Sequence, residues 1–203
     1  MSMTKPPKCT EEIAELLVHI GRSARGEDTD SDLTATQWTA LRFFARANRV
    51  SRTPSAFASF QATTRGTASK TLKSLETKGL LARRRSERDG RSVLFEVTDR
   101  ARVLLERDPL RHLITAIDRS EASSRTGLVR ALSTLAAELA NLRGAPAFGT
   151  CNDCAHYTAG NDGGGYCACV AVDLAPDEVG KLCVSFEHAG NAALDEGSQI
   201  ERR

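Results

Sequence analysis

Apolar residues recur at helical spacing through much of the first 143 residues. The segment TEEIAELLVHIGRSAR begins at Thr10 and predicts a helix, with Thr10 as its cap and Glu11 and Glu12 in its first turn. Its apolar face carries Ile13, Leu16, Leu17 and Ile20. A second helix is predicted over about residues 34–48. Its inner face carries Trp38, Leu41, Phe44 and Ala45.

A short helix and a longer one come next. Thr53 and Pro54 supply a capping hydroxyl and a proline at the first helical position, which predicts a helix over about 54–60 with Phe57 and Phe60 inward. After a turn, a longer helix is capped by Thr64, runs to about Lys78 and ends at Gly79. The buried face of this longer helix is expected to carry Ala68, Leu72 and Leu75. Its outer face carries Arg65, Thr67, Ser69, Lys70 and Lys73.

Two strands are predicted over 80–85 and 92–97, joined by the turn SERDGR. Asp89 and Gly90 in that turn suit a tight hairpin. Helix, turn, helix and a two-stranded wing is the element order of a winged helix–turn–helix.

Three more helices complete this part of the chain. Thr98 and Asp99 cap the first, which runs to about Arg107, and the others are predicted over 109–119 and 123–143. The last helix carries a heptad repeat of leucines: Leu128, Leu132, Leu135, Leu139 and Leu142. Such a seam requires a partner helix, either in the same subunit or in a second chain, and we expect a second chain.

The charge is distributed unevenly along the chain. The net charge is +2, but the residues from Phe148 onward contain nine acids and three bases, which leaves 17 acids and 25 bases before them. Residues 62–92 alone hold nine Lys or Arg and three Asp or Glu. A basic block of this kind is either a solvated face or a surface for phosphate.

No apolar run reaches the roughly 18 residues that a membrane span needs, and the N-terminus has no apolar signal core. The sequence therefore predicts a cytoplasmic protein without a membrane partner. In that compartment thiols stay reduced, and clustered cysteines are typical of metal ligands.

The chain resembles the MarR family of bacterial transcriptional regulators over roughly residues 10–143. The resemblance lies in LTATQWTALRFF at 33–44, TTRGTASKTLKSLETKGLLARRR at 63–85 and DGRSVLFEVTDRARVLLE at 89–106. It implies a homodimer whose N- and C-terminal helices interlock, and double-stranded DNA as the partner.

In this resemblance the helix from Thr64 to about Lys78 is the recognition helix, and position along it assigns the candidate DNA contacts. A helix enters the major groove with its N-terminal end, so the residues expected at base edges are Thr64, Arg65, Thr67 and Lys70. Ser69 and Lys73 are placed for phosphates, and Arg88 and Arg91 at the wing tip for the backbone or the minor groove. Gly66 departs from the pattern, since glycine weakens a helix, but its small size allows close approach to DNA.

Five cysteines lie within 33 residues near the C-terminus. Cys151 and Cys154 form a C-x2-C pair, Cys167 and Cys169 follow a glycine-rich loop, and Cys183 ends the set. We predict a metal site with Cys151, Cys154, Cys167 and Cys183 as ligands and Cys169 as the alternative third ligand. Cys9 stands alone and is expected to be a free thiol.

The cysteine pattern specifies the ligands more closely than the metal that they bind. The spacing and the nearby aromatics Tyr157, Tyr166 and Phe186 loosely resemble high-potential iron–sulfur proteins, which implies a [4Fe-4S] cluster. Zinc is the alternative, with His156 or His188 able to replace a thiolate.

The sequence thus predicts a mainly α fold with a small β wing: a winged helix–turn–helix dimer with a helical dimerisation region and a small irregular metal-binding segment. The expected divisions are a disordered N-terminus (1–9), the MarR-like domain (10–143), a linker (144–149), the cysteine-rich segment (150–188) and a disordered tail (189–203). No arrangement of residues points to an enzyme.

The predicted function is a DNA-binding transcriptional regulator modulated by the cluster, in response to redox state, oxygen, nitric oxide or iron. In this hypothesis the linker lets the cluster change the placement of two recognition helices that must lie about 34 Å apart. The alternative is a small-molecule-responsive repressor with a structural zinc site. The operator, the target genes and the sign of regulation are not encoded in any pattern.

Overall fold

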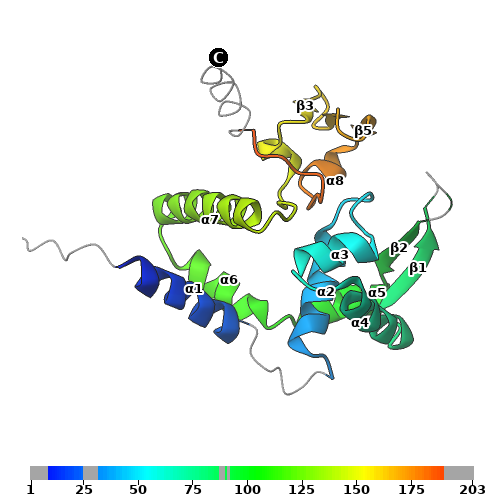
Figure 1. Cartoon of the computed structure of the whole chain (residues 1–203), viewed down its shortest axis with the longest axis horizontal. Helices are drawn as coiled ribbons and strands as arrows, with labels where there is room; N and C mark the ends of the chain where they lie inside the picture. The colour runs from blue at the N-terminus through cyan, green and yellow to red at the C-terminus, as the bar shows by residue number, and fades with distance from the viewer. Residues whose placement is uncertain (1–8, 25–31, 87–89, 91, 190–203) are drawn as a thin grey trace, which may run out of the picture.

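The computed structural model describes residues 9–24, 32–86, 90 and 92–189. Figure 1 shows three parts: a helical arm, a winged helix and a cysteine segment that covers one end of the winged helix. The arm consists of α1 (Thr10–Ser23), α6 (Leu110–Asp118) and α7 (Ala122–Leu142).

The winged helix contains the predicted elements within a few residues of the expected bounds. They are α2 (Ala35–Arg46), α3 (Pro54–Phe60), α4 (Arg65–Thr77), β1 (Leu81–Arg85), β2 (Val93–Val97) and α5 (Asp99–Leu105). The strands β1 and β2 pair antiparallel, with Leu81 opposite Val97 and Arg85 opposite Val93. The predicted caps Thr53, Thr64 and Thr98 each accept a hydrogen bond from a backbone N–H three residues further on, and so does Thr34, which was not predicted as a cap. These hydroxyls satisfy donors that the first helical turn leaves unpaired.

Aromatic rings form the centre of the winged-helix core. Phe43, Phe44 and Phe57 are almost fully buried, and their ring centroids lie 5.1 to 5.8 Å apart. Leu41 of α2, Leu72 and Leu75 of α4 and Phe95 of β2 close this core. Edge-to-face and tilted ring contacts at these distances add to the hydrophobic stabilisation.

Three local expectations were wrong or incomplete. Thr10 is the first helical residue of α1 and Cys9 is its N-cap, so the Thr10 hydroxyl does not cap. Phe60 was expected inward but stays 38% exposed, because it lies on the rim of the core against Phe43 and Phe148. Phe43, which was absent from the expected inner face of α2, is one of its most buried residues.

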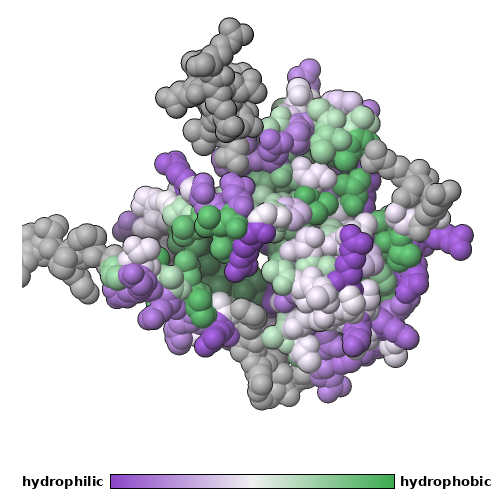
Figure 2. Space-filling model, viewed as in Figure 1, coloured by the Kyte–Doolittle hydropathy of each residue, from purple (hydrophilic) through white to green (hydrophobic). Residues whose placement is uncertain are grey.

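The helical arm has an unpartnered apolar surface. Within the described chain, no residue of α1, α6 or α7 is buried. All five leucines of the predicted seam are exposed, from 40% at Leu132 to 84% at Leu142. Figure 2 shows apolar side chains gathered around a hollow between α7 and α1. Among the described helices, none is long and apolar enough to cross a membrane.

The cysteine segment, residues 150–188, is more regular than the irregular segment that we expected. Its elements are the 3-10 turn η1 (Cys151–Asp153), the strands β3 (Tyr157–Ala159), β4 (Gly165–Cys167) and β5 (Val172–Leu174), and the short helix α8 (Pro176–Val179). The three strands form an antiparallel sheet in chain order. The glycine-rich loop allows this, because a Cβ on Gly164 or Gly165 would lie within 2.4 Å of a backbone carbonyl oxygen.

Candidate nucleic-acid interface and cysteine pocket

The helix α4 is positioned with one face buried and the other free. Its N-cap Thr64 accepts a hydrogen bond from the Thr67 N–H at 3.2 Å, and the two hydroxyl oxygens lie 3.0 Å apart. At the other end Gly79 adopts a φ of +67°, and the Leu80 N–H donates to the carbonyl of Leu75. Both ends of the helix are therefore fixed by local hydrogen bonds.

A side-chain contact also fixes α4 against α2. Gln37 Nε2 donates to Ser74 Oγ at 2.9 Å, while Gln37 Oε1 accepts from the Thr34 N–H at 3.0 Å. Ala68, Leu72 and Leu75 are buried, as the sequence predicted. This packing leaves the opposite face of α4 to solvent.

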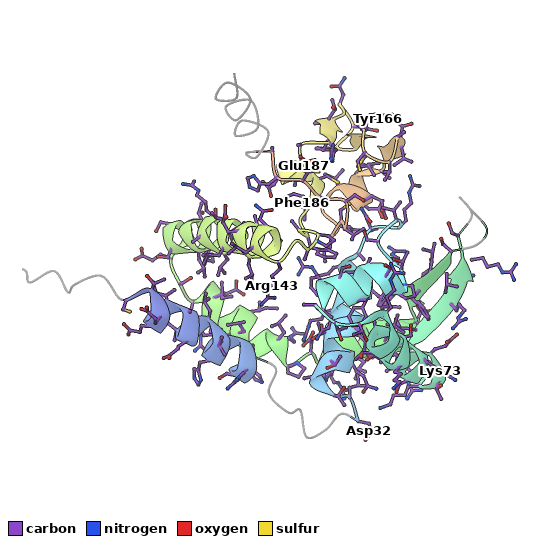
Figure 3. All side chains as sticks on the ribbon, in the orientation of Figure 1. Asp32, Lys73, Arg143, Tyr166, Phe186 and Glu187 are labelled. Atoms are coloured by element: carbon purple, nitrogen blue, oxygen red, sulfur yellow. The ribbon has the colours of Figure 1, made fainter. Side chains whose placement is uncertain are left out.

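The six candidate DNA residues of α4 all lie on that solvent side. They are Thr64, Arg65, Thr67, Ser69, Lys70 and Lys73. Figure 3 shows Lys73 at the outer surface of α4. Among the described residues, none forms an ion pair with Arg65, Lys70 or Lys73. Their positive charge is therefore available to an anionic partner. Arg88 and Arg91, the candidate wing-tip contacts, lie outside the described residues.

The arginines at the base of the wing are partly engaged within the protein. Arg83 pairs with Glu76 of α4 at 3.4 Å, and its guanidinium carbon lies 5.7 Å from the centre of the Phe95 ring. Arg84 pairs with Glu96 across the hairpin at 3.2 Å. The Arg83 pair joins the wing to α4, and the Arg84 pair joins the two strands of the hairpin. Both guanidinium charges are therefore partly neutralised within the protein.

The second candidate site is a pocket in the cysteine segment. Cys151, Cys154, Cys167 and Cys183 all line it, although they come from η1, its C-terminal cap, β4 and a bridge near the end of the segment. We call it the cysteine pocket. Its space measures about 450 Å³, part of it open to solvent. Cys169 is exposed and does not line the pocket.

The electrostatics of the pocket disfavour an uncompensated thiolate. Burial of Cys151 raises the pKa of its thiol to about 11, and the neighbouring Cys183, Cys154 and Cys167 thiols and Glu178 add to the effect. A metal ion reverses this preference, since a coordinating thiol is deprotonated. Among the described residues, no three or more side chains of His, Cys, Asp or Glu are close enough together to hold a single metal ion.

Of the histidines and aromatics that the sequence suggested around the metal, only one lines the cysteine pocket. His156 Nε2 lies 2.9 Å from Glu187 Oε2, and neither His156 nor His188 lines the cysteine pocket. Of the three aromatics, only Tyr157 lines it, with its hydroxyl donating to the Gly164 carbonyl at 2.8 Å. Tyr166 is exposed at the tip of the segment, as Figure 3 shows.

The winged helix itself contributes to the wall of the cysteine pocket, which the sequence did not indicate. Asn48, Arg49 and Val50, from the loop between α2 and α3, line the pocket together with the four cysteines. Asn48 is 4% exposed and Ser51 is fully buried. No sequence signal marked this wall, because the Asn48 N–H and the Ser51 hydroxyl pair with Leu182 and Val184, more than 130 positions away in the chain.

The fold and the exposed basic helix define a winged helix–turn–helix protein. The model of the MarR family matches residues 31–92, the segment that runs from α2 into the hairpin. This part of the chain is therefore similar to the MarR family model in sequence as well as in its order of elements.

The chain is also similar to several solved structures. The S. aureus MepR–DNA complex is 18% identical over 65% of this chain and 99% of that chain, with a TM-score of 0.50, which shows the shared fold. Streptococcus pneumoniae FabT in complex with DNA is 24% identical, covering 66% and 99%, with a TM-score of 0.49. BldR from Sulfolobus solfataricus is 25% identical, covering 63% and 99%, with a TM-score of 0.45. A comparison with curated proteins found no match.

Proposed function

We propose that the protein is a dimeric, DNA-binding transcriptional regulator of the cytoplasm, with a [4Fe-4S] cluster in the cysteine pocket that modulates operator binding. The observation that carries the DNA-binding part is the exposed face of α4. That face places Arg65 and Lys70 in the first two turns of a capped helix whose opposite side is buried. Arg is suited to guanine, and the helix N-terminus is the end that meets base edges.

The exposed leucines of α7 support the dimeric state. A row of apolar side chains at heptad spacing, 40 to 84% exposed, leaves a large apolar surface in water. Complete burial of a fully exposed leucine is worth roughly 1.5–3 kcal/mol, so burial of the exposed part of each of these leucines contributes a fraction of that value. A second copy of the chain, with its own arm, offers a matching surface. It also supplies the second recognition helix that a two-fold symmetric operator requires.

The chemistry of the cysteine pocket supports a cluster ligated by Cys151, Cys154, Cys167 and Cys183. Four thiols from distant positions meet at one pocket, whereas Cys169 is outside it. A tetrahedral zinc ion with bonds of about 2.3 Å needs its sulfurs within roughly 4 Å of each other. A [4Fe-4S] cluster is likewise ligated by four thiolates, so the four cysteines that line the pocket match its donor set in number and type.

A bound cluster would supply a group that responds to redox state, oxygen, nitric oxide or iron supply. The chain's own part is to hold it: β4 and η1 place three thiols, and the Tyr157 ring lines the pocket beside them. The alternative function is a small-molecule-responsive repressor with structural zinc. The same metal analysis decides between the two.

The DNA-binding proposal is tested by titration of the full-length protein with operator candidates selected from random duplexes, over a range of salt. We expect Arg65→Ala to weaken specific binding by about 1–3 kcal/mol and to relax selection at one base pair. Arg130→Ala, an exposed arginine on α7, is the matched control and should bind as wild type. Binding that is insensitive to both salt and Arg65→Ala would contradict the proposal.

The metal proposal is tested on protein purified without oxygen. We expect visible absorption, with about four irons and four sulfides per chain. A colourless protein with one zinc per chain would contradict the cluster and favour the alternative function.

A further inference from the structure

The residues on either side of Cys183 are hydrogen-bonded to the loop between α2 and α3. The Leu182 N–H donates to the Arg46 carbonyl at 2.8 Å, and the Leu182 carbonyl accepts from the Asn48 N–H at 2.9 Å. The Val184 N–H donates to Ser51 Oγ at 2.9 Å. The segment Leu182–Val184 is thus bonded along its length to the helix–turn–helix.

The side chains of this segment alternate between two environments. Leu182 and Val184 pack against the winged-helix core, while Cys183 between them lines the cysteine pocket. Alternation is the expected result of an extended backbone, in which successive side chains point to opposite sides. One short segment therefore belongs to both the core and the pocket.

A second set of contacts joins the same loop to the other side of the pocket. The Arg49 N–H donates to Glu178 Oε2 at 3.0 Å, and the Arg49 guanidinium donates to the Asp173 carbonyl at 3.1 Å. Glu178 is also paired with Lys181 at 2.6 Å. The loop is held by residues from β5 and α8 as well as by the segment around Cys183.

We infer that the loop Ala47–Ser51 transmits the state of the cysteine pocket to the recognition helix within one subunit. This rests on the proposed function, since it assumes a metal group in the pocket and DNA on α4. Separation of the segment from the loop and the end of α2 would break the hydrogen bonds of the Leu182 and Val184 N–H groups. It would also leave the fully buried Ser51 hydroxyl without the Val184 N–H, which is energetically costly. A displacement of Cys183 therefore moves the loop with it.

The path from the loop to α4 is short. Ser51 lies three residues before Pro54, where α3 begins, and α3 packs directly against α4. The Thr63 N–H, just before the cap of α4, donates to the Ala58 carbonyl of α3 at 3.0 Å. Each recognition helix thus responds to the pocket of its own chain. This route does not pass through the linker 144–149 and α7, as the route expected from the sequence does.

The test compares DNA affinity with the metal present and after its removal by a chelator, in full-length wild type, Ser51→Ala and Ser55→Ala. Ser51→Ala removes the acceptor of the Val184 N–H, and Ser55→Ala is a matched change at an exposed position of α3. We expect metal removal to change the dissociation constant about tenfold in wild type and Ser55→Ala, but less than about threefold in Ser51→Ala. Leu182→Ala, which removes packing and keeps the backbone bonds, should give an intermediate ratio.

Hydrogen exchange supplies a readout independent of DNA. Metal removal should increase exchange at the Asn48 and Leu182 amides in wild type. The intrasubunit route would be overturned if metal removal changed the dissociation constant of Ser51→Ala as much as that of wild type. It would also be overturned if exchange at these amides did not change in wild type. Either result would leave the proposed function intact. Wild-type protein that holds no metal, or does not bind DNA, would overturn both.

Discussion

Gln37, in the first turn of α2, and Ser74, near the end of α4, are joined by a hydrogen bond of 2.9 Å. The same Gln37 side chain completes the capping box of α2 with Thr34. One amide therefore fixes both the start of α2 and the angle of the helix proposed to enter DNA. Gln37 is only 8% exposed, so loss of either bond leaves a poorly hydrated polar group.

Replacement of Ser74 tests this connection. We expect Ser74→Ala to lower the free energy of unfolding by about 1 kcal/mol, because the Gln37 Nε2 donor is left without its partner. Urea denaturation measures the change, with Ser55→Ala as a control that should be close to neutral. Equal stability of the two variants would show that solvent replaces the Ser74 hydroxyl.

Gly66 offers a test of how closely α4 approaches DNA. A Cβ at this position would meet only the Thr64 hydroxyl at 3.9 Å, so alanine fits the protein. We expect Gly66→Ala to increase stability by up to about 1 kcal/mol through helix propensity and to weaken operator binding. Gly127→Ala in α7, where a Cβ would also find open space, is the control for propensity alone.

The two measurements on Gly66→Ala separate its two effects. Denaturant unfolding reports the helix, and titration with operator DNA reports the interface. A stabilised variant that binds DNA as tightly as wild type would mean that the backbone at position 66 is not in close contact with the duplex.

The leucine seam predicts a variant that separates the subunits. Leu135 is 50% exposed at the centre of the repeat, and a carboxylate there would be buried in each chain of a dimer. We expect Leu135→Asp to sediment as a monomer and to lose at least about tenfold in operator affinity. Arg130→Asp, an exposed residue at the heptad position opposite the seam, should remain dimeric. A wild-type monomer at micromolar concentration would contradict the assignment of this surface.

The cysteine pocket distinguishes two thiols that the sequence could not. Cys167 lines the pocket and Cys169, two positions later, is exposed outside it. We expect Cys167→Ser to lose most of its metal and Cys169→Ser to retain it, as measured by iron, sulfide and zinc content together with the absorption spectrum. Metal loss in Cys169→Ser with retention in Cys167→Ser would reverse the ligand assignment.

Much of the winged helix follows from local rules. Thr53, Thr64 and Thr98 cap helices because a side-chain oxygen satisfies a free N–H within three residues, an interaction that sequence spacing displays directly. Gly79 ends α4 because the required positive φ favours glycine. The exposed face of α4 follows in the same way from the spacing of Ala68, Leu72 and Leu75.

The two errors have different origins, one local and one tertiary. Thr10 was expected to cap because its residue type suits that role, but Cys9 occupies the position before the first helical turn. Phe60 lies at the rim because Phe43, Phe44 and Phe57 already fill the aromatic core. There it packs against Phe148, which precedes the cysteine segment. The Thr10 outcome is thus a shift of one residue in the helix start, whereas the Phe60 outcome depends on Phe43 and Phe148, which are distant in sequence.

The sequence by itself determined the helices, the hairpin, the basic face of α4 and the presence of a thiol cluster, because capping, periodicity and residue type act over a few positions. Only the tertiary structure decided which thiols share the pocket, and that Asn48 to Val50 form part of its wall. The reason is physical: the buried Ser51 hydroxyl accepts from the N–H of Val184, 133 positions away, and no local pattern encodes such a partner.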